Sequence, residues 1–393
     1  MRPLKGITVV TLEHAIAGPF ASRQLADLGA RVIKVERPGV GDFARGYDER
    51  VRGLASHFVW TNRSKESLTL DVKHPEAKII LQRLILEQAD IVIQNLAPGA
   101  AARLGLSYGA LSKEKPAIIV CDISGYGADG PYRDKKAYDL LIQSESGFVS
   151  VTGTEEEPSK AGPSIADISA GMFAYTNILA ALIQRGQTGR GQHIDISMLE
   201  SLVEWMGYPL YYAFEGAPPP PRTGASHATI YPYGPFPAGD GATVMLGLQN
   251  DREWAKFCEI ALLRPELGRD ERFSTNSKRS AARAQLRAII AEAWSTLTSE
   301  EVLALLDAAQ IANASVNDMH GVWKHPQLHA RKRWRQVDTP AGPVPALLPP
   351  GSWEEEAPRM DAVPALGQHT DSILAELGFS AERISELRAE KAI

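Results

Sequence analysis

One carboxylate in this chain lies where it needs either a partner or a chemical role. Asp167 is flanked by Ile165, Ala166 and Ile168, just where a helical pattern begins. Burying an ionised carboxylate without a partner is costly, so an aspartate among apolar residues needs a reason. A helix N-terminus would stabilise such an anion and offer N–H groups to an oxyanion. A carboxylate there could attack a thioester and form a mixed anhydride, which splits one difficult step into two.

The same position also fits a structural role. Aspartate is among the most frequent residues at helix N-caps, where its carboxylate accepts a backbone N–H. The pattern ISAGMFAYTNILAALIQ predicts a helix that begins directly after Asp167. From the position of this residue alone, the N-cap role and the nucleophile role both stay open.

The elements that would position Asp167 begin in the N-terminal third, where short apolar runs alternate with helical patterns. We expect strands at 6–13, 30–38, 67–73, 89–96 and 117–127, and helices at 19–29 and 75–89. This alternation predicts a parallel sheet with helices on both faces, and ligands of such sheets bind beyond the carboxyl ends of the strands. The binding candidates are therefore His14 to Pro19, Arg37, Asn95 to Arg103, and Ser124 to Tyr126.

Cations follow several of the expected strands. Arg37, Lys73 and Arg103 could together hold several phosphates, although each alone is typical of a solvated surface charge. A nicotinamide cofactor would also fit a sheet of this kind, with Glu36 at the end of the second strand. The first turn, HAIAGPFAS, lacks the glycines that let a pyrophosphate approach the backbone, which argues against a dehydrogenase.

Composition narrows the class of protein further. The chain has 393 residues, of which 44% are hydrophobic and 23% charged, and this composition predicts folded domains. Its net charge of −5 argues against nucleic acid or an anionic membrane as a partner. We expect a cytoplasmic protein, because there is no signal-peptide pattern and no apolar run of about 18 residues. Cys121 and Cys258 form no disulfide framework, and the histidine spacing predicts no metal site.

Two proline-rich stretches divide the chain. The first contains Pro218–Pro221, and the second, 338–364, is rich in proline and acidic residues. Stiff proline-rich segments are typical of linkers. We therefore expect a large domain over 1–205, a linker over 206–224, a small domain over 225–325, a second linker over 326–365 and a C-terminal segment over 366–393.

The sequence resembles the family III CoA-transferases, which include formyl-CoA and carnitine CoA-transferases, along essentially its whole length. The matching segments are LGARVIKVERPGVGDFARG, NRSKESLTLDVKHPEAK, NLAPGAAARLGL, SGYGADGPY, ADISAGMFA, TGRGQHIDISM, RTGASHATIYPYGPF and LGQHTDSIL. The resemblance implies an α/β fold with a large Rossmann-like domain, a smaller α+β domain and a C-terminal segment that returns to the large domain. It also implies a homodimer of two interlocked rings.

The resemblance also implies roles for individual residues. The nucleophilic aspartate of the family falls on Asp167. Coenzyme A would be a thioester substrate rather than a permanently bound cofactor, and its expected contacts are Ala15, Ile16, Arg37, Leu70, Lys73, Asn95, Leu96, Arg103, Leu104, Tyr126 and Tyr138. Backbone N–H groups near Ala15 and Ile16 and at the helix start would hold the oxyanions.

Departures from the family pattern limit the reaction. Oxalate-specific members carry a glutamine where this chain has Ile16, a lysine where it has Ser124, and a run of glycines that is missing here. These differences argue against oxalate as acceptor. The racemases of the same family pair an aspartate with a histidine, and Tyr138 stands in the histidine position, so transfer is favoured over racemisation.

The acceptor acid is the least constrained part of the prediction. We expect succinyl-CoA as donor and a short dicarboxylate such as itaconate, citramalate, mesaconate or glutarate as acceptor. Arg222, His227 and Tyr231 could bind its distal carboxylate, or they could only order the linker. The alternatives left open are a racemase of the same family, a nicotinamide-dependent dehydrogenase and a non-catalytic CoA-binding protein.

Overall fold

A computed structural model covers the chain, and residues 1–351 and 356–393 are described. The chain forms two compact units. Unit 1 contains residues 1–147, 161–206 and 328–393, and unit 2 contains residues 148–160 and 207–327. Unit 2 therefore includes a short segment, 148–160, that composition does not set apart from its neighbours.

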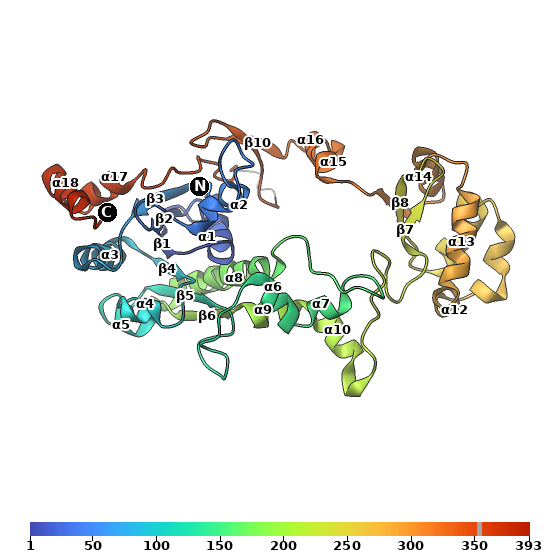
Figure 1. Cartoon of the computed structure of the whole chain (residues 1–393), viewed down its shortest axis with the longest axis horizontal. Coiled ribbons are helices and arrows are strands. Elements are labelled where there is room, and N and C mark those ends of the chain that lie inside the picture. Colours follow the sequence, from blue (N-terminus) through green and yellow to red (C-terminus); the bar gives the residue numbers. More distant parts are fainter. Residues whose placement is uncertain (352–355) are drawn as a thin grey trace. The chain divides into compact units, whose positions relative to one another are not determined.

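Unit 1 is built on a six-stranded sheet with the order β3-β2-β1-β4-β5-β6 (Figure 1). Its strands are β1 (Thr8–Leu12), β2 (Arg31–Glu36), β3 (Lys65–Thr69), β4 (Ile91–Gln94), β5 (Ile119–Ser124) and β6 (His193–Ser197). Every neighbouring pair is parallel. The expected parallel α/β sheet is confirmed, and its carboxyl ends all meet at one edge.

Helices cover this sheet. Those of unit 1 are α1 (Ala17–Asp27), η1 (Phe43–Gly46), α2 (Ser56–Thr61), α3 (Pro75–Gln88), α4 (Ala100–Arg103), α5 (Tyr108–Glu114), α6 (Asp139–Glu145), α8 (Ile165–Thr188), α9 (Met198–Trp205), α17 (Thr370–Glu376) and α18 (Ala381–Ala389). Apolar side chains of α3, α5, α17 and α18 share one core cluster with the strands, and α1 and α8 pack against each other outside it.

The C-terminal segment is part of unit 1. The His369 N–H donates to Ser67 O at 3.0 Å, and the Thr69 N–H donates to Thr370 Oγ1 at 3.0 Å, so the segment is fixed along β3. Within the expected second linker, β10 (Trp334–Val337) and β11 (Val344–Leu347) form an antiparallel hairpin, which its proline content had concealed.

Unit 2 has an antiparallel sheet of β7 (Tyr233–Pro237), β8 (Thr243–Gly247) and β9 (Ala312–Ser315). Its helices are α7 (Phe148–Val151), α10 (Gly207–Tyr212), η2 (Phe214–Gly216), α11 (Asp251–Lys256), η3 (Phe257–Ala261), η4 (Pro265–Arg269), η5 (Glu271–Phe273), α12 (Asn276–Ala281), α13 (Arg283–Ala293), α14 (Ser299–Ala308), α15 (Met319–Trp323) and, across the boundary with unit 1, α16 (Pro326–Ala330). Trp254, Phe257, Phe273 and Trp294 fill its core.

Helix α8 is the one segment of the described chain with the length and composition of a membrane span. Its mean hydropathy reaches 1.4, contrary to the expectation of no such apolar run. The helix packs against α1, β5, β6 and α9, and interior helices of globular domains meet the same criterion. Its apolar character therefore fits its position in unit 1.

Candidate active site

The loops after β1 and β4 follow the point in the sheet where the strand order reverses, which is where sheets of this kind bind ligands. The side chain of Asn95, just after β4, joins the two loops. Its Oδ1 accepts the His14 N–H at 2.8 Å, and its Nδ2 donates to His14 O at 2.9 Å. The two loops therefore meet at the edge of the sheet where α1 begins.

Asp167 lies in the first turn of α8 and is not its N-cap. The helix begins at Ile165, three residues earlier than predicted, and its N-cap, Ser164, makes no side-chain cap. The cap comes instead from Asp139, whose Oδ1 accepts the N–H groups of Ala166 at 2.8 Å and of Asp167 at 3.2 Å. Because another residue caps the helix, the carboxylate of Asp167 is left for a different role.

The carboxylate of Asp167 accepts the N–H of Ala17, the first residue of α1. Gly171, one turn later in α8, makes this approach possible. A Cβ on Gly171 would lie 2.8 Å from Ala17 O and 3.0 Å from Phe20 Cδ1. The close packing of α1 on α8 therefore brings Asp167 to the loop that follows β1.

The protonation of Asp167 is finely balanced. Burial and the nearby Asp139 charge raise the pKa of Asp167 to about 7, and the hydrogen bond from Ala17 opposes them. A carboxylate with such a pKa is partly ionised at neutral pH and is more basic than an ordinary aspartate. Perturbed carboxyl groups of this kind are concentrated at functional sites.

Aromatic side chains that the sequence reasoning missed lie beside Asp167. Burial, Asp42, Asp167 and Tyr138 raise the pKa of Tyr47 to about 12, which places Tyr47 within electrostatic reach of both Asp167 and Tyr138. The Phe43 ring stacks on His14 at 5.3 Å, with Tyr47 next to it. Part of a sequence signal existed, because the segment GDFARG, which contains Phe43 and ends directly before Tyr47, belonged to the family resemblance.

The expected oxyanion donors are largely occupied. The Ala15 N–H donates to Asp42 Oδ1 at 3.1 Å, and the N–H groups at the start of α8 are held by Asp139. The expectation that these groups are free was wrong, because two carboxylates elsewhere in the chain bind them. Of the predicted donors, the Ile16 N–H has no acceptor within residues 1–351 and 356–393.

The three predicted phosphate ligands are exposed at the carboxyl edge of the sheet. Arg37 directly follows β2, Lys73 follows β3, and Arg103 ends α4 in the connection after β4. Over the described part of the chain, none of the three side chains makes a hydrogen bond or ion pair with protein. Three free cations at one edge suit an anionic ligand with several phosphates.

The other predicted CoA contacts are mostly apolar or already bonded. Ile16, the N-cap of α1, is 4% exposed, and Leu70 is buried in the core beside β3. Leu96 and Leu104 pack partly against the same core. In the loop after β5, Tyr126 meets Tyr132 edge-on, and Tyr138 is 69% exposed. Their contact with coenzyme A stays a prediction.

The three residues proposed for the distal carboxylate all belong to unit 2. The guanidinium of Arg222 donates to the backbone oxygens of Ser150, Thr154 and Glu155, which fastens the 148–160 segment. Tyr231 is 3% exposed and lies in the core. His227 Nδ1 accepts the N–H groups of Thr229 and Ile230, which leaves Nε2 to carry the proton. Their role in substrate binding stays a prediction.

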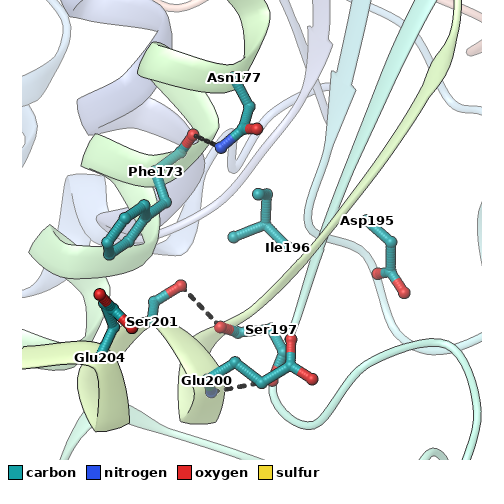
Figure 2. A pocket seen from close by; sticks show the side chains of 8 residues that line it. All are labelled: Phe173, Asn177, Asp195, Ile196, Ser197, Glu200, Ser201 and Glu204. Atoms are coloured by element: carbon teal, nitrogen blue, oxygen red, sulfur yellow. Dashed lines mark hydrogen bonds between the residues drawn. The ribbon is translucent and has the colours of Figure 1, made fainter. Parts of the chain in front are cut away.

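A pocket of about 240 Å³ lies between α8, β6 and α9 (Figure 2). Its lining residues are Phe173, Asn177, Asp195, Ile196, Ser197, Glu200, Ser201 and Glu204. Three of these are acidic and none is basic, so the pocket is unsuited to the phosphates of a nucleotide. None of its lining residues belongs to the loops after β1 and β4.

The described residues give little support to a cysteine nucleophile or a metal site. Burial raises the pKa of the Cys121 thiol far above its usual range, and it raises that of Cys258 to about 12, so both are poor nucleophiles. No cluster of three or more metal-ligating side chains occurs among the described residues. His193 is bound to Asp122 at 2.8 Å on β5.

Comparison with known proteins finds matches over almost the whole chain. The family model described as CoA-transferase family III matches residues 4–370. The chain is 35% identical to a succinate–glutarate CoA-transferase from Agrobacterium fabrum over 95% of this chain and 96% of that one. It is 32% identical to the human succinyl-CoA:glutarate CoA-transferase over 98% of this chain and 89% of that one.

A solved structure has the same fold. The crystal structure of a CAIB/BAIF family protein from Brucella suis matches 95% of this chain and 99% of its own, with a TM-score of 0.85 and 35% sequence identity. A match over nearly the full length of both chains means that the α/β architecture with its antiparallel sheets is shared as a whole.

Proposed function

Because the chain belongs to CoA-transferase family III, we propose that it moves coenzyme A from succinyl-CoA to a short dicarboxylate such as glutarate, with Asp167 as nucleophile. The observation that carries this proposal is the setting of Asp167. Its carboxylate faces the loop after β1, its helix is capped by Asp139, and its pKa is raised to about 7 by burial and by Asp139. A racemase would need a second acid–base group in the position that Tyr138 occupies.

The reaction proceeds through covalent intermediates on one carboxylate. Asp167 attacks the thioester carbonyl of the donor, its oxygen forms a bond to the acyl carbon, and the C–S bond breaks to release the CoA thiolate. The thiolate then attacks the aspartyl carbonyl, which frees the donor acid and leaves an aspartyl-CoA thioester. The acceptor carboxylate attacks this thioester, and the released thiolate finally takes the acceptor acyl group. The Ile16 N–H is the remaining predicted donor to the oxyanions.

The identity of the acceptor rests on two arguments. The relatives from Agrobacterium fabrum and human are named for succinate or succinyl-CoA and glutarate. The loop facing Asp167 carries the apolar Ile16, which suits the methylenes of a C4–C5 acid better than oxalate. Itaconate, mesaconate and citramalate remain in the same class.

We assign the enzyme to the cytoplasm.

The test of acceptor choice compares a diacid with a monoacid of equal length. With succinyl-CoA as donor, kcat/KM for glutarate should exceed that for pentanoate by about a hundredfold or more, because a cation built to bind the distal carboxylate is left unpaired by the monoacid. Mass spectrometry of the CoA products measures both. Equal values would remove the distal-carboxylate site and move the choice to fatty or aromatic acids.

Arg37→Ala should raise KM for succinyl-CoA about ten- to a hundredfold, because each charge-assisted contact is worth about 1.5–3 kcal/mol. The loss should be the same for every acyl group. Arg190→Ala is a matched control, since Arg190 is an equally exposed arginine that precedes β6, at the opposite edge of the sheet. An unchanged KM in Arg37→Ala would exclude Arg37 from the phosphate site.

The homodimer of interlocked rings implied by the family resemblance is part of the same proposal. Its support is a run of exposed apolar side chains around α10: Trp205, Tyr208, Leu210, Tyr211, Tyr212 and Phe214. Exposed apolar patches of this kind mark interaction surfaces. We propose that this apolar patch binds a second copy of the chain.

A further inference from the structure

Four charged side chains form a buried cluster behind the turn that joins β1 to α1. Glu13, Lys34, Asp42 and Lys65 are all buried. Lys34 Nζ lies 2.7 Å from Asp42 Oδ2 and 3.5 Å from Glu13 Oε1, and Lys65 Nζ lies 2.7 Å from the same Glu13 oxygen. Buried ion pairs contribute little net stability, because removing ions from water offsets most of their attraction. The cluster therefore calls for a role beyond stability.

Asp42 is the member that holds the backbone of the turn. Its Oδ1 accepts the N–H groups of Ala15 at 3.1 Å and of Ala44 at 2.9 Å. Ala15 has a φ of 61°, a left-handed conformation that residues other than glycine rarely adopt. From the other side, Asn95 binds both backbone groups of His14. Side chains from other segments thus impose the shape of this turn.

Glu13 and Lys65 fasten the first turns of α1. The Ser22 hydroxyl lies within hydrogen-bond distance of both Glu13 carboxylate oxygens, at 3.0 and 2.8 Å, and Lys65 Nζ donates to Pro19 O at 3.0 Å. Between these contacts and the turn lies Ala17, whose N–H donates to the proposed nucleophile. The buried cluster therefore affects, through the backbone, the hydrogen bond between the Ala17 N–H and the carboxylate of Asp167.

We propose that Asp42 is a positioning residue, which keeps the Ala17 N–H on the carboxylate of Asp167 by holding Ala15 in its left-handed conformation. The inference rests on the proposed role of Asp167 as nucleophile. A hydrogen bond to an ionised carboxylate lowers its pKa, so this contact opposes the burial and the Asp139 charge that raise the pKa of Asp167. Release of the turn would leave less of the nucleophile ionised.

The direction in which the pKa of Asp167 moves distinguishes this positioning role from a simple loss of the Asp42 charge. The titratable groups that face Asp167 from the described residues are Asp139 on α6 and Tyr47 after η1. Removing the negative charge of Asp42 acts on Asp167 only by lowering its pKa. Loss of the Ala17 hydrogen bond acts in the opposite direction and raises it.

The test is the pH dependence of covalent adduct formation at Asp167 in Asp42→Ala, which removes the acceptor of the Ala15 N–H that an asparagine oxygen would keep. With saturating succinyl-CoA, rapid quenching and mass spectrometry give the rate across the neutral range. We expect the midpoint of this pH profile to rise by about one unit, which is the effect of losing one hydrogen bond to a carboxylate. The rate of adduct formation at neutral pH should then fall about fivefold.

Asp27→Ala is the matched control. Asp27 ends α1 at its other end and is equally buried, with hydrogen bonds from Arg63 at 2.8 and 2.6 Å. This variant disturbs a buried ion pair of the same kind and should lose stability without moving the midpoint. An equal shift in both variants would mean general loosening of unit 1, and it would overturn the proposal.

A second variant keeps the proposal testable if Asp42→Ala does not fold. Ala15→Val leaves the ion cluster intact, but a β-branched residue disfavours a φ of 61°, so its midpoint should rise in the same way. A folded variant of either kind with an unchanged or lowered midpoint overturns the role of Asp42. A wild-type enzyme that forms no adduct at Asp167 overturns the proposed function instead.

Discussion

Asp167→Asn should abolish CoA transfer while the protein stays folded and still binds coenzyme A. The amide keeps an oxygen that can accept the Ala17 N–H, so the contact between α1 and α8 is preserved. It cannot form the anhydride, because it lacks the anionic oxygen that attacks the thioester. Loss of a nucleophile costs about 10⁴-fold or more in rate. Steady-state transfer from succinyl-CoA measures the loss, and Asp167→Ala should behave alike.

Chemical trapping assigns the adduct to a residue. Borohydride added after incubation with succinyl-CoA should reduce the acyl enzyme at residue 167 alone, as peptide mass spectrometry would locate it. Glu204→Gln serves as control, since Glu204 is a carboxylate of the acidic pocket between α8 and α9 (Figure 2). It should transfer CoA at the wild-type rate. A labelled peptide elsewhere, or near-normal turnover of Asp167→Asn, would refute the mechanism.

The strands of the sheet could be predicted from the sequence because the pattern that indicates a strand lies within a few neighbouring residues. Strands such as Thr8–Leu12 and Arg31–Glu36 are short apolar runs bounded by turn residues, and both lie within the predicted ranges. The third strand begins two residues before its predicted start, at Lys65, because Lys65 and Ser67 are polar residues buried by partners elsewhere in unit 1. The β11 strand was missed because Pro345 made its segment look like linker.

The details of the site were less accessible, since they depend on contacts between distant residues. Asp167 stands out in the sequence as a carboxylate in an apolar segment. Nothing local indicates that Asp139 caps its helix, and the sequence reasoning considered only the neighbouring Tyr138. Arg222 was assigned from its charge alone, whereas three backbone carbonyls occupy its guanidinium. Residue type predicts chemistry, and long-range hydrogen bonds decide whether the group is free.

The arrangement around Asp167 raises its reactivity by making its ionised form unfavourable. Burial and Asp139 both act against the carboxylate, and a single N–H from Ala17 acts for it. A carboxylate with a raised pKa is a stronger base and a better nucleophile once it is ionised. The same contacts must destabilise the folded protein whenever the group carries its charge, so reactivity and stability are opposed at this residue.

Asp167→Asn should therefore be more stable than the wild type at alkaline pH. In the folded protein the pKa of Asp167 is about 7, against 3.8 for an ordinary aspartate, so the folded state holds a proton that the unfolded chain releases. This contribution is fully present below the unfolded pKa and is lost as pH rises through about 7. A difference of about three units corresponds to about 4 kcal/mol, and partial exposure reduces the expected gain at alkaline pH to about 2–4 kcal/mol.

Urea unfolding of the two proteins, followed by circular dichroism, measures this gain as a difference at each pH. The difference should be small below about pH 3, where Asp167 is protonated in both states, and should reach its plateau above the folded pKa of about 7. In an Asp139→Asn background the amide oxygen can still cap α8, but one cause of the raised pKa is gone. The gain from Asp167→Asn should therefore be smaller there. A constant difference across the pH range would mean that Asp167 is not held at a raised pKa, and that its reactivity has another origin.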